Sequence, residues 1–394
     1  MRLFKYEMRK LLINKNRLIL LSVLFVLYGL ISFLLSAGGE FEIADRAQEK
    51  VAFTEFMELV SENSGKLDPV QLEESKAKVE AAIGEYGEGE PLNYQINRNP
   101  QLRFHRIYTA FGQQVADYRT RVETIQDKIA ELEASGQTDS HEYRLYKKQL
   151  QAELAHGEPV FEYTRAWNFF FIAFDGMLII LMFMIVLTFF ISPLFTQEVK
   201  TEMDSIVLCS EKGRREIVTA KLLSAALTSA ILAAVYLGGW FIGIYFGCGD
   251  LSGYDAPVRC VGAFESTLLN TTAGGAAALC FIWLILVSAV FGTALAFVSS
   301  KMKNQSAAFG LGIAILIAGM ASGNLGRIRK IVWPIMDFNF GALSMATSIF
   351  GGSKIYNFFG TPISYGTAAF MACILLSVLA CLLTYLAQRK RGVL

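Results

Sequence analysis

Long uncharged stretches alternate with charged segments along the chain, and they predict membrane-spanning helices. A helix needs about 20 apolar residues to cross the hydrocarbon core of a bilayer. Lys301 and Lys303 divide two neighbouring apolar stretches into separate spans, because burying both lysines in the membrane would cost roughly 5–7 kcal/mol. This division predicts six spans, at residues 18–36, 166–195, 222–247, 273–299, 306–323 and 365–388.

The segment between the first two spans, residues 37–165, has helical periods and many charges. Apolar residues recur along its centre at alternating spacings of four and three, at Phe111, Val115, Tyr118, Val122, Ile125, Ile129 and Leu132. This heptad pattern predicts a coiled-coil helix. Asp139 and Glu142 form a capping box that would start a return helix. We therefore expect an antiparallel helical hairpin.

Earlier in the same segment, Asp68 and Pro69 are typical of a helix start. Residues 84–100 are rich in Gly, Asn and Pro, and they predict a loop. Two interpretations of the insert stay open. It captures a substrate or contacts a partner, or it forms a lid that packs on its own membrane body.

The charges are unevenly distributed, although the 394-residue chain has a net charge of only +1. Residues 38–165 hold 15 Lys and Arg against 24 Asp and Glu, a net charge of −9. With both termini inside, the inner segments hold 16 basic residues and the short outer ones hold five. The positive-inside rule therefore predicts that both termini are inside and that the insert is outside.

This orientation assigns the segments between the spans. Residues 1–17, 196–221, 300–305 and 389–394 are expected inside. Residues 37–165, 248–272 and 324–364 are expected outside, the last in part re-entrant. A cleaved signal peptide is disfavoured, because the first apolar run exceeds the usual 7–15 residues and five spans follow it.

The first segment has the pattern of an amphipathic helix on the inner membrane surface. Apolar residues share one face, at Phe4, Met8, Leu11 and Leu12, and basic residues would meet anionic headgroups, at Arg2, Lys5, Arg9 and Lys10. The alternative is a positively charged flank that only sets the topology.

Composition and motifs exclude several classes of protein. Hydrophobic residues make up 53% of the chain and DEKR residues only 18%, which excludes a soluble enzyme and a disordered chain. The chain has no GxxxxGK[ST], HExxH or GxSxG motif, and its three His have no metal-ligand spacing. We therefore expect no enzyme activity, no bound metal or cofactor, and no nucleic-acid partner.

Three features of the spans and outer loops are candidate sites. Asp175 would be a polar group at the outer mouth of a path between spans, or an interfacial acid bonded to a neighbouring helix. Gly239, Gly243 and Gly247 would pack a helix closely, within the chain or in a dimer. Cys248 and Cys260 would form a disulfide outside, or remain two thiols.

The inner loop at residues 196–221 carries the most specific pattern. Glu198 follows the second span, and a short amphipathic stretch with Glu202, Met203, Ile206 and Val207 comes after it. A turn then leads through basic residues into the third span, at Arg214, Arg215 and Lys221.

This loop resembles that of the type 2 export family of ABC transporter permeases. In that family an acidic residue after the second span precedes a short helix that ends in small residues, and an Arg and a Lys then lead into the third span. Glu198, residues 206–210, Arg214 or Arg215, and Lys221 match these positions. The order of a basic start, one span, a large outer insert and five further spans is also similar.

The resemblance implies an all-α polytopic membrane protein of a bacterial cell membrane, acting as the permease subunit of an exporter. A separate ABC-type ATPase subunit would bind ATP and Mg, and a second permease chain, identical or not, would complete the path. Coupling would use Glu198, Glu202, Met203, Ile206, Val207, Arg214 and Arg215. The alternative is a membrane-anchored sensor or scaffold that acts through its outer hairpin.

Overall fold

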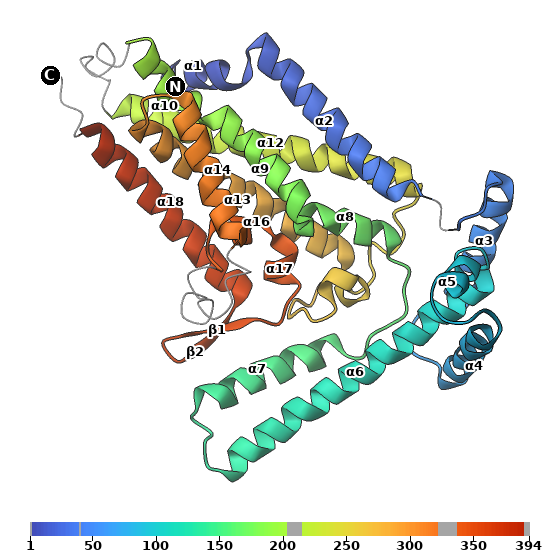
Figure 1. Cartoon of the computed structure of the whole chain (residues 1–394). Coiled ribbons are helices and arrows are strands. Elements are labelled where there is room, and N and C mark those ends of the chain that lie inside the picture. The colour runs from blue at the N-terminus through green and yellow to red at the C-terminus, as the bar shows by residue number, and fades with distance from the viewer. Residues whose placement is uncertain (1, 39–40, 203–214, 322–336, 390–394) are drawn as a thin grey trace.

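The structure of the chain is a computed structural model. It describes all residues except 1, 39–40, 203–214, 322–336 and 390–394. The described residues form a bundle of long helices and a helical insert attached to one end of it (Figure 1). The start of the chain and the end of its last helix lie at the opposite end of the bundle, which we call the terminal face. The end that carries the insert is called the insert face.

Five helices of the bundle are long and apolar enough to cross a membrane, which indicates a multi-pass membrane protein. One of them is formed by α9 and α10 together, over Met177–Lys200. The helices that supply these five candidates are α2 (Lys15–Ser36), α9 (Met177–Ile191), α10 (Pro193–Lys200), α12 (Glu216–Cys248), α13 (Ala273–Lys301) and α18 (Tyr365–Arg389). The expected span at 306–323 corresponds to the shorter helix α14 (Gln305–Ala321).

The second expected span begins later in the structure than residue 166. A separate helix, α8 (Arg165–Asp175), ends where Gly176 leaves the helical conformation with ψ 94°, and α9 starts at the next residue. The backbone N–H of Gly176 bonds to the carbonyl of Ile172, which closes α8. The uncharged stretch 166–195 is therefore two helices, and only the second belongs to a candidate span.

The core of the bundle is built around α12, which packs along α2 on one side and α13 on another. The Tyr236 ring stacks on Phe183 with ring centres 4.8 Å apart, and it meets Tyr28 edge-on at 4.6 Å. The Tyr236 hydroxyl donates to the carbonyl of Ala173 at 2.7 Å, so its one polar atom is satisfied within the apolar core.

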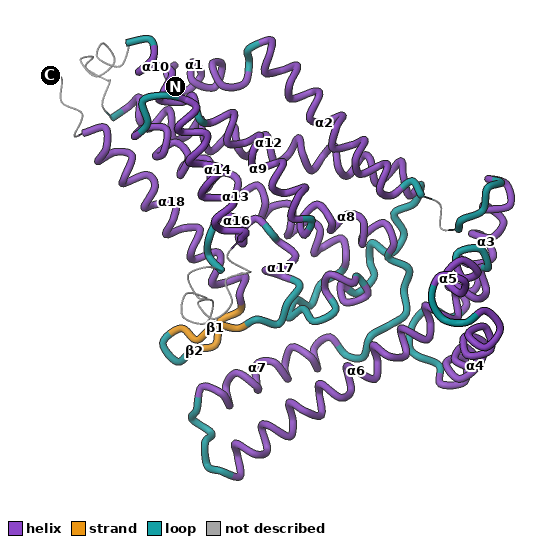
Figure 2. Tube along the Cα trace, viewed as in Figure 1, coloured by secondary structure: helices purple, strands orange, loops and turns teal. Residues whose placement is uncertain are grey.

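The remaining short elements include the two β-strands of the described residues, which lie near the insert face (Figure 2). They are η1 (Val258–Cys260), η2 (Gly262–Phe264), α16 (Phe340–Ser344), α17 (Ala346–Phe350), β1 (Ile355–Phe358) and β2 (Thr361–Ser364). The two strands form an antiparallel hairpin that pairs Ile355 with Ser364. The fold is mostly helical, as expected, with this hairpin as a small addition.

The described residues of the insert form five helices. They are α3 (Arg46–Glu62), α4 (Pro69–Tyr86), α5 (Glu90–Ile96), α6 (Pro100–Ala134) and α7 (His141–His156). The Asp68 side chain accepts from the N–H of Val70, with Pro69 at the first helical position, as the sequence predicts. The heptad residues lie on α6, and α7 returns beside it as the second half of a hairpin.

Two local predictions for the insert are wrong. Residues 84–100 contain the helix α5, which packs Leu92 and Ile96 against Ala82. The cap of α7 is Ser140 rather than Asp139, because the Ser140 hydroxyl accepts from the N–H of Tyr143 at 3.1 Å.

The hairpin packs on the membrane body, as the lid interpretation of the insert requires. Glu153 of α7 pairs with Arg259 of η1 at 2.6 Å, and both side chains are buried. Arg259 also donates to the carbonyl of Thr267 at 2.8 Å. Near the middle of α7, Lys148 donates to the carbonyl of Pro362 in β2 at 2.7 Å.

Candidate functional site

Three helix segments meet at the terminal face and bring together four charged side chains. The first helix, α1 (Arg2–Leu12), lies against α12, with Leu11 and Leu12 buried. Pro193 starts α10 directly beyond α9, because a proline at the first helical position loses no internal hydrogen bond. We call the charged residues Glu7, Lys10, Glu198 and Lys221 the ionic junction.

Lys221 is the centre of the ionic junction. Its side chain is fully buried, near the start of α12. The Nζ atom donates to Glu198 Oε1 at 2.6 Å and to the carbonyl of Leu194 at 2.7 Å. It also lies 3.6 Å from Glu7 Oε1 and 4.9 Å from the ring centre of Phe195.

Lys10 closes the ionic junction from the α1 side. Its Nζ atom lies 3.5 Å from Glu198 Oε1 and 4.0 Å from Glu7 Oε2. Two ammonium groups therefore face two carboxylates, which balances charge in a site with little access to water. Removing one member of such a buried set leaves its partner uncompensated, at a cost of about 3–5 kcal/mol.

A cavity of about 350 Å³ borders the ionic junction. Besides members of the junction, its walls are formed by Leu3, Tyr6, Gln197, Thr201, Ile217 and Ala220. The Oε2 atom of Glu7 is buried and accepts no hydrogen bond from the described residues. A charged neighbour of this oxygen is the Lys10 Nζ atom, at 4.0 Å.

The structure brings some of the predicted coupling residues together and leaves others apart. Glu198 is in the ionic junction. Glu202 is exposed just after α10, with a left-handed φ of 57°, and Arg215 is exposed at the start of α12. The other predicted residues, Met203, Ile206, Val207 and Arg214, lie outside the described residues.

Sequence reasoning missed the role of α1 in this site. Lys10 was expected to face lipid headgroups but pairs with Glu198, and Glu7 was not singled out. A signal was present: Glu7 is the one acid among residues 1–17, four residues from both Leu3 and Leu11. This spacing puts it on the same helical face as those apolar residues.

The glycine stripe of α12 packs against α2 within the same chain. A Cβ atom on Gly239 would lie 2.5 Å from the carbonyl oxygen of Phe25, and one on Gly243 would lie 2.1 Å from that of Gly29. A Cβ on Gly247 would lie 1.9 Å from the Ser36 hydroxyl. The three glycines let the two helix backbones approach each other.

Asp175 is exposed at the C-terminal end of α8. The sequence placed it within a span, but the helix break at Gly176 puts it before the candidate span that starts at Met177. The prediction that Asp175 lines a translocation path assumed a charge inside a spanning helix. The structure does not support that assumption, because Asp175 lies outside the candidate span.

No disulfide joins Cys248 and Cys260 in the structure, and their oxidation outside the cell stays a prediction. The Cys260 thiol donates to the carbonyl of Val160 at 3.3 Å. Burial raises the pKa of Cys260 to about 12, which suppresses the thiolate that oxidation requires. Among the residues that the structure describes, no three His, Cys, Asp or Glu gather into a metal-binding group.

Comparison of the chain with protein-family models finds no match, and comparison with curated proteins finds none either.

Proposed function

We propose that this chain is the membrane-spanning permease subunit of an ATP-driven ABC exporter in a bacterial cell membrane. It would span the membrane six times with both termini inside. A separate nucleotide-binding subunit would bind ATP and Mg, and a second permease chain would complete the translocation path. The observation that carries the proposal is the ionic junction, which anchors both ends of the segment that resembles a coupling loop.

The anchoring follows from the positions of the junction residues. Residues 201–215 connect α10 to α12. Glu198 lies three residues before this segment and Lys221 lies six residues after it, and the two side chains bond to each other. A push by a partner on residues 201–215 would therefore move the ends of α10 and α12 together.

A second set of bonds carries such a push into the bundle. Ser299 of α13 donates its hydroxyl to the carbonyl of Ser192 at 2.8 Å and accepts from the N–H of Phe195 at 3.0 Å. These bonds lie where α9 gives way to α10, so motion of α10 would be passed to α13. Such a linkage is what a transporter needs between an ATPase and its helices.

The cavity beside the ionic junction supports a partner at this face. Its lining combines the apolar side chains of Leu3 and Ile217 with the charged side chains of Lys10 and Glu198, so a docked subunit could make both kinds of contact there. The competing function, a membrane-anchored sensor or scaffold, would use the insert instead and would not need a partner at the terminal face.

The expected partner is a P-loop ATPase encoded by a neighbouring gene, and its co-purification with this chain tests the proposal. Replacing Met203 and Ile206 by Asp removes the apolar face expected in the coupling segment. We expect this double variant to lose the ATPase on purification and to lose its stimulation of ATP hydrolysis.

The matched control places the same kind of change in the insert, at Val51→Asp and Val70→Asp, where both side chains are exposed. This control should retain the ATPase. Normal binding and stimulation by the Met203→Asp, Ile206→Asp variant would contradict the proposal, and recovery of a kinase in place of an ATPase would favour the sensor.

A further inference from the structure

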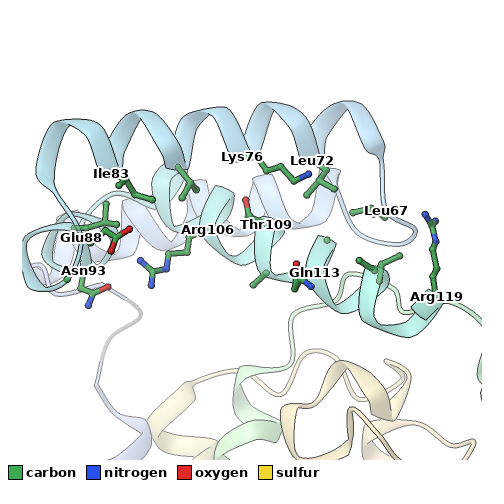
Figure 3. A pocket seen from close by; sticks show the side chains of 17 residues that line it. Leu67, Leu72, Lys76, Ile83, Glu88, Asn93, Arg106, Thr109, Gln113 and Arg119 are labelled. Carbon is green, nitrogen blue, oxygen red and sulfur yellow. The ribbon is translucent and has the colours of Figure 1, made fainter. Parts of the chain in front are cut away.

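A groove of about 900 Å³ runs along the insert between α4 and α6 and is closed at one end by α5 (Figure 3). Its floor and walls are apolar, formed by Leu67, Leu72, Val79, Ile83, Leu92 and Val115. The close approach of the helices depends on Gly112 of α6, where a Cβ atom would lie 2.4 Å from the Leu72 side chain.

The charge at the rim of the groove is opposite to that of the insert around it. Lys76, Arg106 and Arg119 line the groove, with Glu88 as the one acid in the lining. Residues 38–165 as a whole have 15 basic and 24 acidic residues. The insert is acidic as a whole, but basic side chains line this one groove. The positive potential at the groove would attract an anionic ligand.

These cations are accessible to a ligand. Arg106 is exposed. Arg119 pairs with Glu158 at 2.8 Å and Lys76 with Glu73 at 2.8 Å, but all four of these side chains are more than 40% exposed. Exposed pairs of this kind contribute about 0–1 kcal/mol and exchange readily for a ligand carboxylate.

The spacing of the charges distinguishes between kinds of anionic ligand. Arg106 and Arg119 lie toward opposite ends of the groove, and Lys76 lies between them on the other wall (Figure 3). The two arginines are thirteen positions apart on α6, or about 20 Å along the helix axis at 1.5 Å per residue. A single headgroup cannot reach both ends, whereas a peptide with carboxylates along its length can.

We infer that this groove binds an acidic amphipathic peptide segment. The apolar face of the peptide would cover the partly buried side chains of the groove, and its carboxylates would meet the three cations. These side chains are Leu67, Leu72, Val79 and Ile83. Exposed Ala110 and Ala116 on α6 leave room for a helix to lie close to the groove floor. The inference is independent of the proposed coupling to an ATPase, because an exporter and a sensor could both use such a groove.

Fluorescence anisotropy on the full chain in zwitterionic lipid nanodiscs tests this inference. The probe is a labelled 14-residue helical peptide with Leu on one face and Glu on the other. Two comparison peptides carry Gln or Lys in place of Glu, and empty nanodiscs give the background. We expect saturable binding of the Glu peptide, with at least tenfold weaker binding of the other two.

Variants then locate the binding site. Lys76→Glu with Arg106→Glu should weaken binding of the Glu peptide at least tenfold, and Ala116→Trp should weaken it by filling the floor. The matched control, Lys128→Glu with Lys147→Glu, makes the same charge change at exposed positions outside the groove. Equal binding of the Glu and Lys peptides, no saturable binding, or equal losses in groove and control variants would overturn the inference.

Discussion

Lys221 holds an ammonium group where water cannot reach it, and two carboxylates and a carbonyl replace its hydration. Taking a charge out of water costs several kcal/mol, which is recovered only when the partners have good geometry. The 2.6 Å bond to Glu198 and the 2.7 Å bond to Leu194 provide that geometry. The residue is therefore a joint between α12 and α10 rather than a surface charge.

Lys221→Met should destabilise the protein by about 3–5 kcal/mol, because the carboxylates of Glu198 and Glu7 lose their buried cation. The expected readout is a lower temperature of unfolding in detergent. Lys200→Met makes the same change at an exposed position of α10 and should change stability by less than about 0.5 kcal/mol. Equal stability of the two variants would show that the ionic junction does not hold the helices together.

The insert should lose stability as the pH falls below about 6.5. Burial, with a smaller effect of Lys78, lowers the pKa of His105, whose Nδ1 lies 3.0 Å from the buried hydroxyl of Ser75. A histidine whose pKa is lower in the folded state binds more protons when unfolded. Its stabilising effect is thus present above its unfolded pKa and is lost as the pH falls through the folded pKa.

Limited proteolysis of the insert between pH 7.5 and 5 would measure this loss. His105→Gln should show a weaker acceleration of cleavage with acid than the wild type. An identical pH profile in the two proteins would exclude His105 as a contributor.

At the scale of elements, α2 and α12 are joined by backbone contact that any side chain on the glycine stripe would block. Gly243→Ala should separate them, since its Cβ would lie 2.0 Å from the Ser32 hydroxyl and 2.1 Å from the Gly29 carbonyl. Overpacking of this kind costs about 1–3 kcal/mol or more. Gly238→Ala is the matched control, because its Cβ would meet only a Phe25 ring carbon, at 3.5 Å.

Thermal unfolding of the two alanine variants gives the comparison. We expect a clear drop for Gly243→Ala and little change for Gly238→Ala. A dimer seam on this stripe would instead show as a shift to monomers in Gly243→Ala without a loss of helix stability.

The docking of the hairpin depends on the buried pair between Glu153 and Arg259. Glu153→Gln should loosen α7 from the membrane body, which faster hydrogen exchange along α7 would report. Glu142→Gln, an exposed change on the same helix, should leave exchange unaffected. Equal exchange in both variants would mean that the other contacts of α7 suffice to dock it.

Charge-free runs predict the C-terminal ends of α13 and α18 closely, because the charged residues Lys301 and Arg389 mark them; the runs themselves begin earlier than the helices, at residues 266 and 355. Residues 18–36, 273–299 and 365–388 correspond to Lys15–Ser36, Ala273–Lys301 and Tyr365–Arg389. The helix break at Gly176 was not predicted, because the turn between α8 and α9 interrupts the apolar sequence with a single charged residue only. A different limit hid α5, because its helix lies in a stretch whose Gly, Asn and Pro residues favour a loop.

The candidate site was only partly predictable for a related reason. Glu198 stands out within its own segment, but the roles of Glu7 and Lys10 come from α1 lying against α12. Contacts between residues so far apart in the chain produce no recognisable sequence pattern, apart from the one acid, Glu7, on the apolar face of α1.

At the scale of the whole molecule, the ionic junction lies at one end of the bundle and the peptide groove belongs to the insert at the other. The positive-inside count predicts that these ends face opposite sides of the membrane. A cysteine placed at Gly136 should react with an impermeant reagent added to intact cells, and one placed at Ser205 should not. Labelling at Ser205 under these conditions would contradict the orientation.

The central claim, that the terminal face couples the chain to an ATPase, is tested most directly by ATP hydrolysis in proteoliposomes. The measurement compares the partner ATPase reconstituted with the wild-type chain, with Glu198→Gln and with the control Lys200→Met. We predict that the ATPase hydrolyses ATP at the same rate with the wild type and with Lys200→Met. The Glu198→Gln chain should still fold and bind the ATPase, but the hydrolysis rate should change severalfold. The same rate with all three chains, equal to that of the ATPase alone, would contradict the account.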